Sequence, residues 1–195
     1  MKHRPGRQAR RAGIALAAAA AFAALGIGTA QAAQFTRADI TLDSAGNLTC
    51  GFRETGLGAL SLVTYDCGAL ALGVVSGCFV KNKFVGPFAV SISKDVTTHE
   101  SNPLLAKNNG AINGSITVEV PEGGGGEVQC NHEAGAEPQV VAVRWCNASL
   151  MDVTNNIVGA TSGQLTDILL RTGDQVAPIP TCTEILAAPG DGGEG

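Results

Sequence analysis

Two His-Glu pairs carry the side chains of this chain that could most readily hold a metal ion. They are His99-Glu100 and His132-Glu133, and Asp152 adds a further carboxylate. Imidazole nitrogens with carboxylate oxygens are typical zinc or copper ligands. However, the H-E-x-x-H spacing of zinc hydrolases is absent, and both pairs lie in polar stretches typical of loops. We expect solvated loop residues and no cofactor, with a metal site at His99, His132 and Asp152 as the alternative.

The run after Asp152 offers a second way to bind a cation. Asp152, Asn155 and Asn156 could present carboxylate and amide oxygens to calcium. The same residue types also close strand ends through Asx turns, in which the side chain accepts a hydrogen bond from nearby backbone. We favour the Asx turn.

No arrangement for nucleophilic catalysis is apparent. The G-x-S-x-G elbow of serine hydrolases is missing, and Gly159–Gly163 places Ser162 one residue away from that pattern. Acidic residues are plentiful, but the chain has one Trp and one Tyr, too few for the aromatic platforms typical of sugar-binding clefts. We therefore assign no catalytic residues.

The chain contains six cysteines, and an even number in an exported protein predicts three disulfides. No C-x-x-C motif or Cys/His cluster favours a metal site or a reactive thiol. Six cysteines can pair in many ways. Cys50 and Cys67 fall on inward faces of neighbouring strand segments, a second pair would join the two halves, and a third would fasten Thr181–Ile185. The favoured pairs are Cys50–Cys67, Cys78–Cys130 and Cys146–Cys182.

The N-terminal region has the pattern of a secretory signal peptide. Basic residues precede an apolar run from Ala12 to Ile27, and the small residues around Ala32 suit a cleavage site. Arg10-Arg11 hints at twin-arginine export, although general secretion fits the residues that follow better. The alanine-rich run, which indicates a bacterial origin, is shorter than the ~20 strongly apolar residues of a membrane span. We expect residues 1–32 to be removed and the mature protein to be secreted without a membrane span, with cell-surface association left open.

Removal of that segment would leave a strongly acidic protein. Five of the 13 Lys and Arg residues precede residue 33, so eight remain against 17 Asp and Glu, a net charge of about −9. Such a surface repels phosphate backbones. Nucleic acid is therefore not an expected partner, and a protein or small-molecule ligand is.

Alternating polar and apolar residues predict an all-β fold. Period-two patterns with turn residues between them indicate strands with one buried face. Trp145 continues one such pattern and is expected in the core, and 162–171 could form a strand or a short helix. The alternating segments are Ala38–Leu42, Leu48–Phe52, Val63–Cys67, Phe88–Ile92, Ile116–Val120 and Val141–Trp145. The turn residues are Ala45–Asn47, Asn109-Gly110, Asn113-Gly114 and the flexible run Gly123–Gly126.

This pattern predicts one domain over residues 33–186 and a Gly-rich C-terminal tail over 187–195. We expect an antiparallel β-sandwich, immunoglobulin-like or similar and stapled by disulfides, with a small β-barrel as the alternative.

Several stretches resemble a group of small exported bacterial proteins that has no assigned function. Leu48–Gly58 is similar to their LTC-x-F-x-E-x-GLG start, Tyr65–Cys67 to a YxC motif, and Lys107–Gly114 to a KNGxIxG turn. Asn147–Asn156 is similar to their late DTTN-like run. The resemblance implies no activity and no catalytic residues. Cys146 stands where that group has a small polar residue, so Cys182 would be its added partner, which supports that pairing.

These observations favour a secreted, non-enzymatic binding or interaction protein that acts through its loops or a sheet face. A structural component of the cell envelope or the extracellular space, self-associating through an edge strand, is the alternative. A hydrolase with an unrecognised site is the third hypothesis.

Overall fold

The computed structural model describes residues 32–99, 103–121, 128–131, 133–170, 172–173 and 175–189. The expected signal peptide lies outside these ranges except for residue 32, as does most of the expected tail and all of the glycine run 123–126. No helix within the described ranges is both long and apolar enough to cross a membrane.

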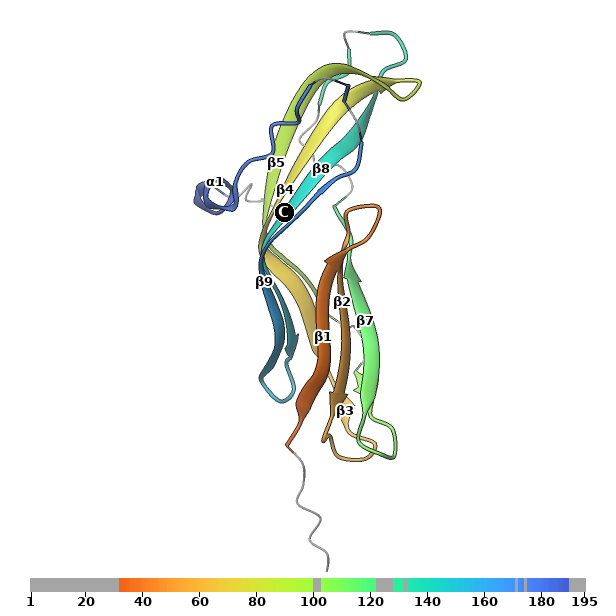
Figure 1. The fold of residues 1–195 in the computed structure, drawn as a ribbon, viewed down its shortest axis with the longest axis vertical. Helices are drawn as coiled ribbons and strands as arrows, with labels where there is room; N and C mark the ends of the chain where they lie inside the picture. The colour runs from red at the N-terminus through yellow and green to blue at the C-terminus, as the bar shows by residue number, and fades with distance from the viewer. Residues whose placement is uncertain are drawn as a thin grey trace, which may run out of the picture.

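Two antiparallel sheets form a β-sandwich (Figure 1). The first has the order β1-β2-β7 and the second the order β5-β4-β8-β9, which is the strand order of immunoglobulin-like domains. The strands lie in separate sheets, so the small β-barrel that was the alternative does not form. Their bounds are β1 (Gln34–Leu42), β2 (Leu48–Thr55), β4 (Tyr65–Val80), β5 (Lys83–His99), β7 (Ile112–Val118), β8 (Glu137–Asp152) and β9 (Ile157–Ile168).

Three small elements complete the described fold. The strands β3 (Leu62–Val63) and β6 (Leu104–Leu105) pair as a short ribbon at one end of the sandwich. The helix α1 (Cys182–Ala187) packs on β4 and β8. Figure 1 shows the second sheet continuing well past the end of the first.

The main core lies between the two sheets and follows the alternation in the sequence. Leu48, Cys50 and Phe52 of β2 are all at most 4 % exposed. Trp145 is fully buried, as predicted, and its indole nitrogen donates a hydrogen bond to the carbonyl of Gly46 at 2.9 Å. Gly46 has a φ of +82°, and a side chain there would meet Val143, so this turn requires glycine.

The structure corrects three local predictions and decides one that was open. Val90 is 39 % exposed and does not share a buried face with its neighbours in β5. Asn113-Gly114 lies inside β7 rather than in a turn, because it pairs in register with β2. Of the two alternatives for 162–171, residues 162–168 form strand, and the helix of the described residues lies at α1. Several strands are also much longer than short-strand spacing suggests, with 16 residues in both β4 and β8.

All three predicted disulfides are confirmed: Cys50–Cys67, Cys78–Cys130 and Cys146–Cys182. The first joins β2 to β4 across the core. The third fastens α1 to β8, and a capping box between Thr181 and Glu184 begins that helix. Lys94 of β5 donates hydrogen bonds to the carbonyls of Ile185 and Leu186 near the end of the helix. The C-terminal segment is therefore bound tightly to the outer face of the second sheet.

Ile185→Ala is expected to lower the free energy of unfolding by about 2 to 3 kcal/mol. Ile185 is fully buried, and its Cδ1 atom fills the space that a side chain at Gly73 would need. Urea unfolding of the oxidised protein measures the change. Leu186→Ala is the matched control, because Leu186 is 39 % exposed and should change the same free energy by less than about 0.5 kcal/mol. Equal losses in the two variants would contradict this packing.

Candidate functional site

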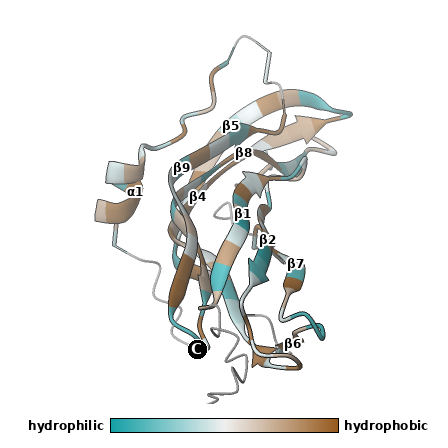
Figure 2. Ribbon diagram, turned by 60° about the horizontal axis from the view of Figure 1, so that its bottom comes forward, coloured by the Kyte–Doolittle hydropathy of each residue, from teal (hydrophilic) through white to brown (hydrophobic). Residues whose placement is uncertain are grey.

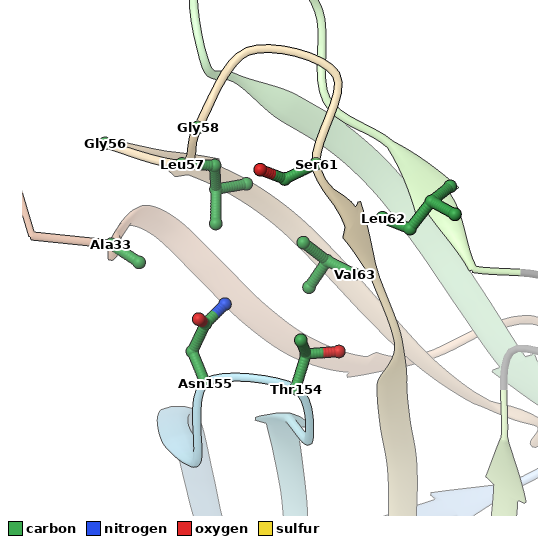
Figure 3. A pocket seen from close by; sticks show the side chains of 9 residues that line it. All are labelled: Ala33, Gly56, Leu57, Gly58, Ser61, Leu62, Val63, Thr154 and Asn155. Carbon is green, nitrogen blue, oxygen red and sulfur yellow. The ribbon is translucent and has the colours of Figure 1, made fainter.

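A hollow of about 470 Å³ lies at the end of the sandwich where β2 and β8 finish. The connection from β2 to β3 forms one wall, and the turn between β8 and β9 forms the other (Figure 3). Figure 3 shows the side chains of Leu57 and Val63 on one side, and those of Thr154 and Asn155 facing them from the turn. The residues that line the hollow are Ala33, Gly56, Leu57, Gly58, Ser61, Leu62, Val63, Thr154 and Asn155.

Hydrogen bonds between distant loops fix the first wall. The backbone N–H of Leu57 donates to the carbonyl of Gly110, and that of Ala106 donates to the carbonyl of Ser61. Gly110 has a φ of +67°, and a Cβ atom there would lie 2.0 Å from the Leu57 carbonyl oxygen. Only glycine allows this close approach. The connection 106–111 therefore supports the wall from behind.

The second wall is fixed to the strand that follows β3. The backbone N–H of Thr64 donates to the hydroxyl of Thr154 at 2.9 Å, and the N–H of Val153 donates to the carbonyl of Thr64 at 2.9 Å. Both walls are thus held in place by hydrogen bonds that do not involve any ligand.

An exposed apolar surface borders this hollow. Leu60, Leu62 and Leu105 are 60 %, 60 % and 57 % exposed, and we call them the leucine patch. Leu62 and Leu105 are direct partners in the β3–β6 ribbon, so their side chains lie on the same face. Figure 3 shows Leu62 pointing away from the hollow, and Figure 2 shows hydrophobic colouring at the β6 end of the molecule. The patch and the hollow together make a surface with both apolar and polar side chains.

A pair of buried carboxyl groups lies behind the second wall. Glu54 of β2 and Asp152 of β8 are both fully buried. Glu54 Oε2 accepts a hydrogen bond from the hydroxyl of Tyr65 at 2.7 Å, while Oε1 has no donor among the described residues. Asp152 accepts two hydrogen bonds from Asn155, at 2.9 and 2.6 Å, which is the Asx turn favoured from the sequence. Asn155 thereby connects the acid pair to the hollow.

The pKa of Glu54 is raised to about 7, chiefly by burial and with a smaller contribution from the neighbouring Asp152, while the hydrogen bond from the Tyr65 hydroxyl opposes the increase. Burial disfavours the charged form of a carboxyl group, because the ionised oxygens lose their hydration. Glu54 therefore carries a proton below about pH 7. Burial, and then the bond to Glu54, also raises the pKa of Tyr65.

The acid pair is enclosed in the fold and does not contact solvent. Catalytic acids must reach a substrate proton, and both carboxyl groups are fully buried. What the pair does is connect β2, β4 and β8 at the point where the two walls begin. Chemistry on a bound molecule would have to come from the hydroxyl and amide groups of Ser61, Thr154 and Asn155.

Only one of the three predicted metal-ligand side chains, that of Asp152, lies within what the structure describes. His99 ends β5 with its backbone paired to Asp66, its side chain is not described, and His132 lies outside the described ranges. Asp152 points into the acid pair instead. Within the described residues no group of three or more His, Cys, Asp or Glu side chains could hold a metal ion. The alternative metal site at His99, His132 and Asp152 stays a prediction.

Glu54 is the residue that sequence reasoning missed, although a signal was present. It continues the inward face of Leu48, Cys50 and Phe52 by one further alternation. A carboxyl group on that face requires a buried partner. The partner, Asp152, lies far away in the chain and could not be identified from spacing.

Comparison of the chain with protein-family models, curated proteins and solved structures gives no match. The resemblance to small exported bacterial proteins therefore stays a prediction, and the function is inferred from the geometry.

Proposed function

We propose that this chain is a secreted, non-enzymatic binding protein, and that its binding surface is the leucine patch with the adjoining hollow. The observation that carries the proposal is the 60 %, 60 % and 57 % exposure of three leucines at one end of the fold. Large apolar side chains gathered on a monomer surface typically mark an interaction site. The secreted location is supported by three disulfides, which form in oxidising compartments.

The position of this surface supports the proposal. In immunoglobulin variable domains the loops that follow the second strand and connect the last two strands lie at the antigen-binding end. Here the corresponding connections, 56–61 and 153–156, are the two walls of the hollow. This is an analogy of fold alone, and the hollow supplies the independent observation.

A protein segment is the proposed occupant rather than an enclosed small molecule. The hollow is open to solvent, since Thr154 and Asn155 in its lining are exposed, and the leucine patch lies beside it rather than inside it. A small ligand would leave the patch uncovered. An extended apolar segment of a partner could cover the patch and place one side chain in the hollow.

Leu62→Ser with Leu105→Ser is expected to abolish partner binding while leaving the fold intact. Both side chains are exposed, so the free energy of unfolding should change by less than about 0.5 kcal/mol. Native mass spectrometry of unreduced protein taken from its own culture medium measures the bound mass. We expect the wild-type protein to carry a bound partner and the double variant to carry none.

Leu70→Ser is the matched control, because Leu70 is 52 % exposed on β4 outside the patch, and this variant should keep the complex. A bound second copy of the chain that depends on the patch would favour the alternative, a self-associating envelope component. A wild-type protein without a bound partner, or a double variant that keeps its partner, would contradict the leucine patch as the binding surface.

A further inference from the structure

The connection from β9 to α1 presents one apolar side chain to solvent. Val176 is 88 % exposed, more than any other large hydrophobic residue that the structure describes. No described residue forms a hydrogen bond with its backbone groups. Figure 1 shows this connection, in blue, running over the part of the second sheet that extends past the first. Single exposed hydrophobic residues are common on protein surfaces, so the support on either side of Val176 is the informative feature.

The chain just before Val176 is fixed by Thr172. This threonine is only 9 % exposed, and its hydroxyl donates a hydrogen bond to the carbonyl of Gln175. The N–H of Gln175 in turn donates to the carbonyl of Thr172 at 3.4 Å. Gly173 has a φ of +69°, a conformation that glycine adopts without strain. These two hydrogen bonds close a turn that ends directly before the exposed valine.

The chain just after Val176 is fixed by packing and by a disulfide. Ala177 and Ile179 are partly buried against a hydrophobic cluster of β4 and β8. The carbonyl of Pro180 accepts a hydrogen bond from the guanidinium of Arg144 at 2.6 Å. The Cys146–Cys182 disulfide follows two residues later. The exposed valine is therefore held on both sides and does not lie on a free tail.

A segment held in this way has the physical properties of a protease inhibitor. Residues 175–181 form neither helix nor strand, so their backbone is open to pairing with an enzyme cleft. A loop that is fixed before binding loses little conformational entropy when it binds. Hydrolysis after Val176 would add water across the bond and free the amine of Ala177. Because Ala177 is packed on the sheet, that amine would stay beside the new carboxylate, and the cut loop would not leave as product.

We propose that this connection inhibits serine proteases that cleave after small aliphatic residues, with Val176 as the residue that enters the specificity pocket. Valine suits a small apolar pocket such as that of elastase, whereas the pocket of trypsin carries an aspartate and takes a basic side chain. This activity goes beyond the proposed function and does not involve the leucine patch. The two surfaces lie apart, since β9 begins beside the hollow at Ile157 and ends at Ile168, where the connection starts.

An enzyme assay with pancreatic elastase tests the proposal. Hydrolysis of a chromogenic peptide is followed while the full oxidised protein is added in increasing amounts. We expect inhibition with a dissociation constant of about 1 µM or lower. Trypsin, assayed with its own substrate, should keep its full rate at the same protein concentrations.

Two variants make the test specific. Val176→Lys is expected to weaken the inhibition of elastase by at least about 30-fold and to create inhibition of trypsin. Val158→Lys is the matched control, because Val158 is 60 % exposed in β9 outside the connection. This control should inhibit elastase as the wild-type protein does and should not inhibit trypsin. Both substitutions are at exposed positions, so both variants should keep the fold.

Elastase that keeps its full rate with the wild-type protein, or equal inhibition by Val176→Lys, would overturn the proposal. Mass spectrometry of the assay mixture supplies a further check. Rapid cleavage after Val176 without inhibition would also overturn it, because the loop would then be an ordinary substrate.

Discussion

Replacing Cys78 and Cys130 with Ala is expected to lower the free energy of unfolding by about 4 kcal/mol. The disulfide closes a loop of 52 residues. In the chain-entropy model a disulfide that closes a longer loop lowers the conformational entropy of the unfolded chain more and so stabilises the fold more. Cys78 is also fully buried, so the shorter alanine side chain loses packing there. Urea unfolding under oxidising conditions measures the change.

The other disulfides provide the comparison. Removing Cys50–Cys67, which spans 17 residues, is expected to cost about 3 kcal/mol by the same reasoning on loop length. Peptide mapping of the unreduced variants must show the two remaining pairs intact. A loss below about 1 kcal/mol for the 52-residue loop would contradict the expected role of that disulfide.

We expect the free energy of unfolding of the wild-type protein to fall between about pH 4.5 and pH 7, and we expect Glu54→Gln to abolish this fall. The pKa of Glu54 rises to about 7 in the folded protein, mainly because the carboxyl group is buried. Each tenfold gain in proton affinity corresponds to about 1.4 kcal/mol, so the variant should be more stable by up to about 3 kcal/mol at pH 8. At pH 4 the two proteins should be similar.

The direction follows from proton binding. Below about pH 4.5 the carboxyl group is protonated in both the folded and the unfolded chain, and the stabilising effect of its raised pKa is fully present. As the pH rises, the unfolded chain loses this proton first, while the folded chain keeps it until about pH 7. The free energy of unfolding therefore falls across this interval and levels off above it.

Chemical unfolding at a series of pH values measures this difference. Glu119→Gln is the control, because Glu119 is exposed and its replacement should leave the pH profile of the unchanged protein in place. Parallel profiles for Glu54→Gln and the wild-type protein would contradict the raised pKa of Glu54.

Local sequence patterns predicted the sandwich and the Cys50–Cys67 disulfide because both follow from alternation. Cys50 and Cys67 occupy inward positions of strands that the structure confirms as buried. The length of β4 was missed because Gly, Ala and Ser interrupt its apolar pattern, and both of its faces are covered. The helix α1 had a usable signal in the Thr181–Glu184 capping box, but it is only six residues long.

The candidate sites depend on contacts that spacing does not reveal. The walls of the hollow come from residues far apart in the chain, joined by the hydrogen bond from Thr64 to Thr154. Val176 is held exposed because Ala177 and Ile179 pack on a hydrophobic cluster of β4 and β8. Predicting either would require the packing of the strands, which the sequence alone does not supply.

Site-specific photo-crosslinking tests the proposed binding surface most directly. A benzoyl-phenylalanine at position 62, within the leucine patch, is compared with the same residue at position 70 on β4, which is 52 % exposed in the unchanged protein. Irradiation takes place in the protein's own culture medium. We expect one defined adduct from position 62, lost when Leu105→Ser is added, and none from position 70. Equal adducts at both positions, or none at position 62, would contradict the leucine patch as the binding surface.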